Sequence, residues 1–211
     1  ALPGATAARE MLVKDATEYL DNLAQDAGDN PDLQNELAQA YLKIGNVQGS
    51  VYTANLGDSD GALKSYEKSI AIVEDLRQKS PDNVEYLKSY LETTDQKTLL
   101  LVRLNRWQEA EQIGGKSLEA SRRLTELEPG NLDFQIKQVR SLQTMGDVIN
   151  FSGGHQSSIE WYRRSLEAAE KLYAENPKDE IVRRNVIVPL QRIGTKSEYY
   201  AEILKETGAS P

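Results

Sequence analysis

The residue types best suited to catalysis or metal binding are scarce in this chain. It has 211 residues, with one histidine and no cysteine. His155 lies in the stretch SGGHQ, a turn that leads into a helical pattern. A metal ligand or general base needs partner side chains of matching chemistry, and neither cysteine nor a second histidine can supply them. We therefore interpret His155 as an exposed turn residue and expect no metal, no cofactor and no catalytic residue.

Charged pairs are the other candidates for chemistry. The carboxylate pairs Glu109/Glu111 and Asp179/Glu180 fall at expected helix starts. The helix dipole stabilises acidic residues there, and we favour this explanation over a catalytic role. Three arginine pairs could hold an oxyanion through bidentate hydrogen bonds. They are Arg122-Arg123, Arg163-Arg164 and Arg183-Arg184. Glutamates three or four residues away offer them helical partners, which favours solvated salt bridges over a phosphate site.

The balance of charge argues against two classes of partner. Lys and Arg number 25 against 33 Asp and Glu, so the net charge is −8. A nucleic-acid binder usually carries a basic patch, and we expect no nucleic-acid partner. The longest apolar run, residues 99–102, is far below the ~20 residues that cross a bilayer, so we expect no membrane insertion by this segment. The first residues lack the basic-then-apolar order of a secretory signal, and we expect a piece of a longer protein.

Regularly spaced prolines indicate an internal repeat. They are Pro31, Pro81, Pro129 and Pro177, and the differences between successive sequence numbers are 50, 48 and 48. Proline can separate two helices at such positions. Nineteen positions before the last three prolines the residue is always small: Ala62, Ala110 and Ser158. Small side chains there let two helices approach closely, and Tyr66 and Tyr162, four residues further on, fill the space beside them.

The repeat predicts an all-α chain. Apolar residues recur at intervals of three and four, and no segment shows the alternation of a strand. We expect about eight elongated helices in antiparallel hairpins within one array. Its parts are a leading helix in residues 1–30, repeats in 31–80, 81–128 and 129–176, and a trailing helix in 177–211. Counting back from Pro31 places Leu20 and Ala16 of the leading helix in the register of the second helices. Repeat one carries a loop insertion near residues 50–54, and Pro189 is expected to kink the trailing helix or divide it in two.

Several stretches resemble a known family. NLGDSDGALKSYEKSI, residues 55–70, resembles the second half of a tetratricopeptide repeat, and Ile44-Gly45-Asn46, Met145-Gly146-Asp147 and Ile193-Gly194 resemble the Leu-Gly step of its first helix. The period of about 48 residues departs from the family's ~34, because each helix is about two turns longer. The resemblance implies helix pairs stacked in a right-handed superhelix.

A narrower resemblance covers residues 2–58. This stretch, with its ARE–LV–YLD–LA–D run, ELAQAY helix and VQG…ANLGD loop, resembles the region that follows the catalytic domain of bacterial serine/threonine protein kinases, notably acidobacterial ones. The resemblance implies a signalling protein whose kinase domain lies outside this segment. The segment itself has no Gly-rich nucleotide loop, His-Arg-Asp or Asp-Phe-Gly motif, so we expect no enzyme here. The sequence does not identify the location, and both the cytoplasm and a membrane tether through the parent chain stay open.

The tetratricopeptide resemblance also implies a binding surface. Such arrays bind a peptide or partner helix along the concave face of the first helices, and register places these residues there: Asn46, Arg103, Gln143, Asn150, Gln191 and Tyr199. Amide side chains suit a peptide, because each can donate to and accept from a backbone. Asp95 and Asp147 stand where the cationic clamp of chaperone-tail binders would be, which excludes that ligand class. The loop with Val51 and Tyr52 is either a second candidate surface or a segment whose Tyr52 tucks against the helices.

The function is therefore expected to be a scaffold for protein–protein interaction, with a partner that the sequence does not identify. Two alternatives remain open. One is a structural spacer that self-associates through its end faces, and the other is an enzyme that uses an unrecognised carboxylate site.

Overall fold

The computed structural model describes residues 5–26 and 28–193, and all regular structure in these ranges is helical. The helices are α1 (Ala5–Asp26), α2 (Pro31–Gly49), α3 (Ser59–Lys79), α4 (Val84–Arg103), α5 (Trp107–Leu127), α6 (Leu132–Phe151), α7 (His155–Glu175) and α8 (Glu180–Ile193). Within these ranges, the all-α prediction and the expected eight helices are confirmed. No helix within the described ranges is both long and apolar enough to cross a membrane.

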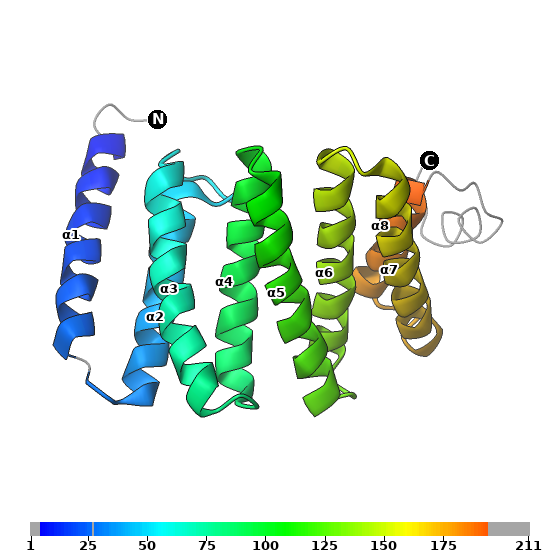
Figure 1. Ribbon diagram of the computed structural model, residues 1–211, viewed down its shortest axis with the longest axis horizontal. Coiled ribbons are helices and arrows are strands. Elements are labelled where there is room, and N and C mark those ends of the chain that lie inside the picture. Colours follow the sequence, from blue (N-terminus) through cyan, green and yellow to red (C-terminus); the bar gives the residue numbers. More distant parts are fainter. Residues whose placement is uncertain (1–4, 27, 194–211) are drawn as a thin grey trace. The chain divides into compact units, whose positions relative to one another are not determined.

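The chain divides into two compact units, residues 1–127 with α1–α5 and residues 128–211 with α6–α8. In the first unit, α2 and α3 form one antiparallel hairpin and α4 and α5 a second, while α1 packs on α2 (Figure 1). In the second unit, α6 and α7 form a hairpin and α8 packs on α7. The division of the sequence into three repeats between two outer helices stays a prediction.

Amide side chains start the first helix of each pair. Asn83 and Asn131 lie one repeat period apart and accept hydrogen bonds from backbone N–H groups of the first turn of α4 and α6. Asn30 does the same for α2. Pro31 is the first residue of α2, whereas Pro81, Pro129 and Pro177 each lie three residues before a helix. The leading helix therefore stands in a register three residues away from the one that counting from Pro31 predicts.

The small-residue positions are helix contacts, as the repeat predicts. Ala62, Ala110 and Ser158 are buried. The Tyr66 ring of α3 covers Gly45 of α2 so closely that a Cβ on the glycine would lie 2.5 Å from the ring. The second unit repeats this contact between Tyr162 of α7 and Gly146 of α6. In the α4–α5 hairpin the larger side chain is on the first helix instead of the second. Thr98 occupies the position of the glycine and Gly114 that of the tyrosine, and both residues are buried.

The second unit has an apolar core between α6, α7 and α8. Its buried members are Ile136, Val139, Ala169, Leu172, Val182, Val186 and Leu190. Helix α8 continues through Pro189, which is itself buried, as far as Ile193. The helix is therefore not divided at this proline within the described residues.

The insertion after α2 forms an ordered loop over residues 50–58. The Asn55 amide donates to the carbonyls of Ser50, at 2.6 Å, and Thr53, at 2.9 Å, while its oxygen accepts from the Gly57 N–H. The Asp58 N–H donates to the Gln48 carbonyl at 3.0 Å. These bonds fix the loop against the last turn of α2. Tyr52 in this loop is 72% exposed, so its side chain does not tuck against the helices.

Candidate partner-binding site

The amides predicted to line a groove already make hydrogen bonds within the chain. The Asn46 oxygen accepts from the Tyr66 hydroxyl at 2.8 Å. The Asn150 oxygen lies 2.7 Å from Nδ1 of His155, which is exposed at the start of α7. The Gln143 amide donates to the Asn185 carbonyl at 3.1 Å and so links α6 to α8. In each amide, either the oxygen or the NH₂ group is therefore already used in a hydrogen bond within the chain.

The remaining predicted groove residues differ in their surroundings. Arg103, at the end of α4, is exposed and donates to the Gly49 carbonyl at 3.0 Å and to the Ser59 hydroxyl at 3.3 Å. Gln191 is exposed on α8. Tyr199 lies outside the described residues. The structure thus places Asn46 and Arg103 around the same end of the α2–α3 hairpin, and Gln143, Asn150 and Gln191 on the first helices of the second unit.

Residues of the charged pairs predicted from the sequence form ion pairs and hydrogen bonds with other residues of the chain. Arg123 contacts Asp82 at 2.6 Å and Glu126 at 3.2 Å, and Arg122 contacts Glu126 at 3.4 Å, in line with the salt-bridge interpretation. The Asp179 carboxylate accepts from two N–H groups in the first turn of α8. Across residues 5–26 and 28–193, no three His, Cys, Asp or Glu side chains are grouped in a way that could hold a metal ion.

A recurring tyrosine–acid–cation cluster was not expected from the sequence. Asp21 accepts from the Tyr41 hydroxyl at 2.7 Å and from Lys68. Glu74 accepts from Tyr90 and Lys116, each at 2.8 Å. Asp147 accepts from Tyr162 at 2.8 Å and from Arg192 at 2.7 Å. Lys68 and Lys116 lie one repeat period apart. This spacing is the feature of the sequence that could have predicted the repeated cluster.

The pKa shifts of these groups match their role in packing. Burial, followed by the neighbouring carboxylates, raises the pKa of the Tyr41, Tyr90 and Tyr162 phenols above their usual value. Burial also acts to raise the pKa of the Asp21 and Glu74 carboxyls. Hydrogen bonds from the lysines and tyrosines outweigh that effect, so both pKa values lie below the usual value. The clusters of Asp21 and Glu74 hold a neutral phenol beside a charged carboxylate, which is a structural arrangement.

Helix α1 carries a stripe of uncovered apolar side chains. Leu12, Ala16 and Tyr19 follow the i, i+4, i+7 spacing of one helix face, and Leu12 and Tyr19 are each 67% exposed. The positions equivalent to Ala16 in α3, α5 and α7 hold buried serines: Ser69, Ser117 and Ser165. The last two bond to the preceding helix, at Asp95 and at the Val139 carbonyl. We call Leu12, Ala16 and Tyr19 the α1 stripe.

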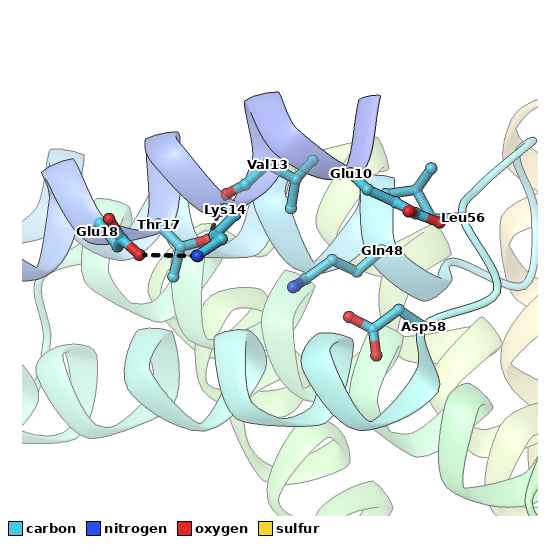
Figure 2. A pocket seen from close by; sticks show the side chains of 8 residues that line it. All are labelled: Glu10, Val13, Lys14, Thr17, Glu18, Gln48, Leu56 and Asp58. Carbon is cyan, nitrogen blue, oxygen red and sulfur yellow. Dashed lines mark hydrogen bonds and ion pairs between the residues drawn. The ribbon is translucent and has the colours of Figure 1, made fainter. Parts of the chain in front are cut away.

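A pocket of about 400 Å³ lies on the other side of α1, facing the end of α2 and the 50–58 loop (Figure 2). Its lining residues are Glu10, Val13, Lys14, Thr17, Glu18, Gln48, Leu56 and Asp58. Figure 2 shows the Gln48 amide between α1 and α3, with the Asp58 carboxylate beside it. Lys14 and Glu18 form an ion pair at 3.8 Å along one rim. The pocket draws on α1, α2 and a loop, so no local motif predicts it.

Comparison with known proteins adds little. The sequence matches no protein-family model and no curated protein. Among solved structures it is similar to a mutant of MamA, with 16% sequence identity and a TM-score of 0.45 over 96% of this chain and 95% of that one. At this low similarity the match carries no inference about fold, partner or function.

Proposed function

We propose that the chain is a non-catalytic scaffold that binds an amphipathic helix of a partner polypeptide. The observation that carries the proposal is the α1 stripe. Leu12 is equivalent to Ser65 of α3, which is buried and donates to Gln48 of the preceding helix at 2.6 Å. The same face of α1 meets no helix in the described part of the chain. In the α2–α3 hairpin, the equivalent face of α3 is covered by α2. The α1 stripe is apolar and runs along the helix, so a partner helix is the element that would cover it best.

The charge around the α1 stripe indicates what kind of helix would bind. Asp15 and Asp26 are exposed beside the stripe, and Arg9 lies at its N-terminal end. The whole chain is acidic, with a net charge of −8. A helix with an apolar face flanked by Lys or Arg would complement this surface, whereas an acidic helix would be repelled.

Titration with synthetic helices tests this proposal. The probes are an amphipathic peptide with Lys and Arg beside its apolar face and a matched peptide with Glu in their place. The basic peptide should bind the full chain, and the double variant Leu12→Ser/Tyr19→Ser should weaken its affinity about tenfold or more, because two apolar contacts are lost. Ile181→Ser, which changes an exposed apolar residue of α8, is the matched control. Equal binding by the double variant, or tighter binding of the acidic peptide, would contradict the proposal.

In each unit, the first helices of the hairpins offer a second proposed contact surface, as the tetratricopeptide resemblance implies. Arg103 is exposed there in the first unit and Gln191 in the second. Asn46, Gln143 and Asn150 each commit one half of the amide to the fold, and the other half would serve a ligand. The NH₂ groups of Asn46 and Asn150 could donate to peptide carbonyls, and the Gln143 oxygen could accept from a peptide N–H.

The parent protein is proposed to be a bacterial signalling protein with a serine/threonine kinase domain outside this segment. The support is the resemblance of residues 2–58 to the region that follows the catalytic domain in such kinases. Sequencing the complete reading frame tests this directly. A frame with no kinase motifs would remove the proposal and leave the scaffold function unaffected.

Self-association is the second candidate function, favoured by the same exposed stripe. Two copies could cover Leu12 and Tyr19 of each other by packing α1 on α1. Sedimentation of the full chain over a wide concentration range separates the two functions. A dimer that Leu12→Ser/Tyr19→Ser dissociates would support a spacer, and a monomer at all concentrations would exclude it.

A further inference from the structure

We propose that the pocket beside α1 receives a lysine or arginine side chain of the partner polypeptide. This inference rests on the proposed scaffold function and names the chemistry of a second contact. The pocket lies on a different side of α1 from the stripe and is lined by other residues. Three observations carry the proposal: a buried amide that faces the pocket, an acceptor beside it, and an acidic rim.

The buried amide belongs to Gln48, in the last turn of α2. Only 7% of this residue is exposed. Its oxygen accepts from the Ser65 hydroxyl at 2.6 Å, which fixes the orientation of the amide and turns the NH₂ group toward the pocket (Figure 2). Within the described part of the chain, that NH₂ group has no hydrogen-bond acceptor. Because the group faces the pocket, a ligand carbonyl placed there could accept its hydrogen bond.

An acceptor stands next to this donor. One oxygen of Asp58 accepts from the Gly61 N–H at 2.9 Å and caps α3. The other oxygen converges with the Gln48 NH₂ group over Gly61, where a Cβ would collide with both atoms. Glycine at this position keeps the space open. A donor and an acceptor side by side are complementary to a peptide group, whose carbonyl can accept and whose N–H can donate.

The rim selects for positive charge. Glu10, Glu18 and Asp58 contribute three carboxylates against the single amine of Lys14, which Glu18 already pairs. Val13 and Leu56 provide apolar walls for the methylene stem of a long side chain. The volume of about 400 Å³ lies within the range of ligand pockets, roughly 300–1,000 Å³. A long cationic side chain with its own peptide group meets all of these features.

Nuclear magnetic resonance of the full chain offers a direct test. The probes are N-acetyl-arginine amide and N-acetyl-lysine amide, with N-acetyl-citrulline amide as the neutral isostere. The Gln48 side-chain NH₂ and Gly61 N–H signals should shift saturably with both cationic probes and weakly with citrulline. Agmatine, a guanidinium compound without the peptide group, should bind less tightly. Equal shifts with citrulline would overturn the assignment to a cation, and equal binding of agmatine would overturn the assignment to a polypeptide.

Matched variants locate the binding. Glu10→Gln/Asp58→Asn removes two rim charges and retains a good helix cap, since asparagine caps as well as aspartate. It should weaken binding of N-acetyl-arginine amide about tenfold, the loss expected for a charged hydrogen-bond partner. Asp32→Asn/Glu36→Gln makes the same charge change at the far end of α2 and should leave binding unchanged. Equal losses in the two double variants would overturn the pocket as the site.

The two double variants test the pocket proposal and the scaffold proposal separately. A basic helix that binds wild type, loses affinity with Leu12→Ser/Tyr19→Ser and is unaffected by Glu10→Gln/Asp58→Asn would support the α1 stripe and overturn the pocket. Loss of affinity with both double variants would support a partner that uses both sides of α1.

Discussion

The contact between Tyr66 and Gly45 shows how one residue pair fixes the spacing of a hairpin. Tyr66 is completely buried, so its ring cannot swing into solvent to make room for a side chain on the glycine. Its hydroxyl reaches the Asn46 oxygen, which fixes the ring along the helix axis as well. Glycine within a helix costs roughly 1 kcal/mol relative to alanine. At this position the close packing of the two helices offsets that cost.

Gly45→Ala should therefore destabilise the chain, even though alanine is the better helix former. The methyl group must displace a buried ring, and overpacking of this kind costs about 1–3 kcal/mol in the free energy of unfolding. Urea unfolding measures the change. Gly115→Ala is the control, because a Cβ there meets no atom within 4 Å, and it should stabilise by ~1 kcal/mol. Equal gains from both substitutions would show that the Tyr66 contact does not limit the packing.

The Tyr66 phenol also makes stability depend on alkaline pH. Burial raises its pKa to about 12, while Arg103 acts weakly in the other direction. Below the ordinary tyrosine pKa of ~10, both folded and unfolded chains hold the proton and its contribution is complete. Between pH 10 and 12 the unfolded chain releases the proton first, so rising pH favours unfolding.

Tyr66→Phe should make the alkaline loss of stability less steep. The expected difference is at most ~1 kcal/mol per pH unit above pH 10, since one titrating group is removed. The free energy of unfolding is measured by urea titration at pH 8, 10 and 11 for both proteins. Tyr41, Tyr90 and Tyr162 remain, so the variant should still lose stability at high pH. Parallel curves for the two proteins above pH 10 would contradict the prediction.

At the scale of helices and turns, the repeat is marked by backbone conformation. Gly57, Asn105 and Gly153 follow one another at one repeat period and have φ values of 77°, 59° and 97°. After α4, Arg106 N–H donates to the Leu101 carbonyl and Asn105 N–H to the Val102 carbonyl. The corresponding bonds follow α6 and end that helix in the same way. Each left-handed residue turns the chain directly into the next helix.

Gly153→Ala should cost about 1–2 kcal/mol of stability, because a side chain with a Cβ is strained at positive φ. Asn105→Gly is the matched substitution in the other hairpin and should be neutral or stabilising, since glycine adopts this conformation freely. Thermal unfolding of the two variants makes the comparison. A destabilising Asn105→Gly would show that the asparagine side chain, rather than its φ, sets the turn.

The helices follow from the sequence more readily than the site does. The small positions Ala62 and Ala110 mark helix contacts because close approach constrains side-chain size at each repeat. The register of α1 was predicted from Pro31, and the structure differs because this proline begins α2 instead of preceding it. The pocket was not foreseen. Gln48 faces it only because the loop and Ser65 position the amide, and such contacts leave no periodic pattern.

At the scale of the whole molecule, the dominant property is acidity. Acidic residues outnumber basic ones by 33 to 25. Basic side chains pair with some of the carboxylates, as Lys171 does with Glu167, and the net charge of −8 is what remains after all positive charges are counted. A net charge of this size attracts a basic partner over a distance set by ionic strength, about 10 Å at 0.1 M salt and 30 Å at 0.01 M.

The association rate of a basic amphipathic helix should therefore fall as salt rises, while its dissociation rate changes little. Long-range attraction acts on the encounter, whereas the apolar contacts of Leu12 and Tyr19 are made only after docking. Stopped-flow fluorescence between 0.01 M and 0.1 M salt should show a decrease of about tenfold in the association rate for the basic peptide. A peptide with Gln in place of Lys and Arg should show almost none. If salt instead accelerated dissociation and left association unchanged, the charges would act within the docked complex, and the pocket rather than the overall acidity would account for the preference.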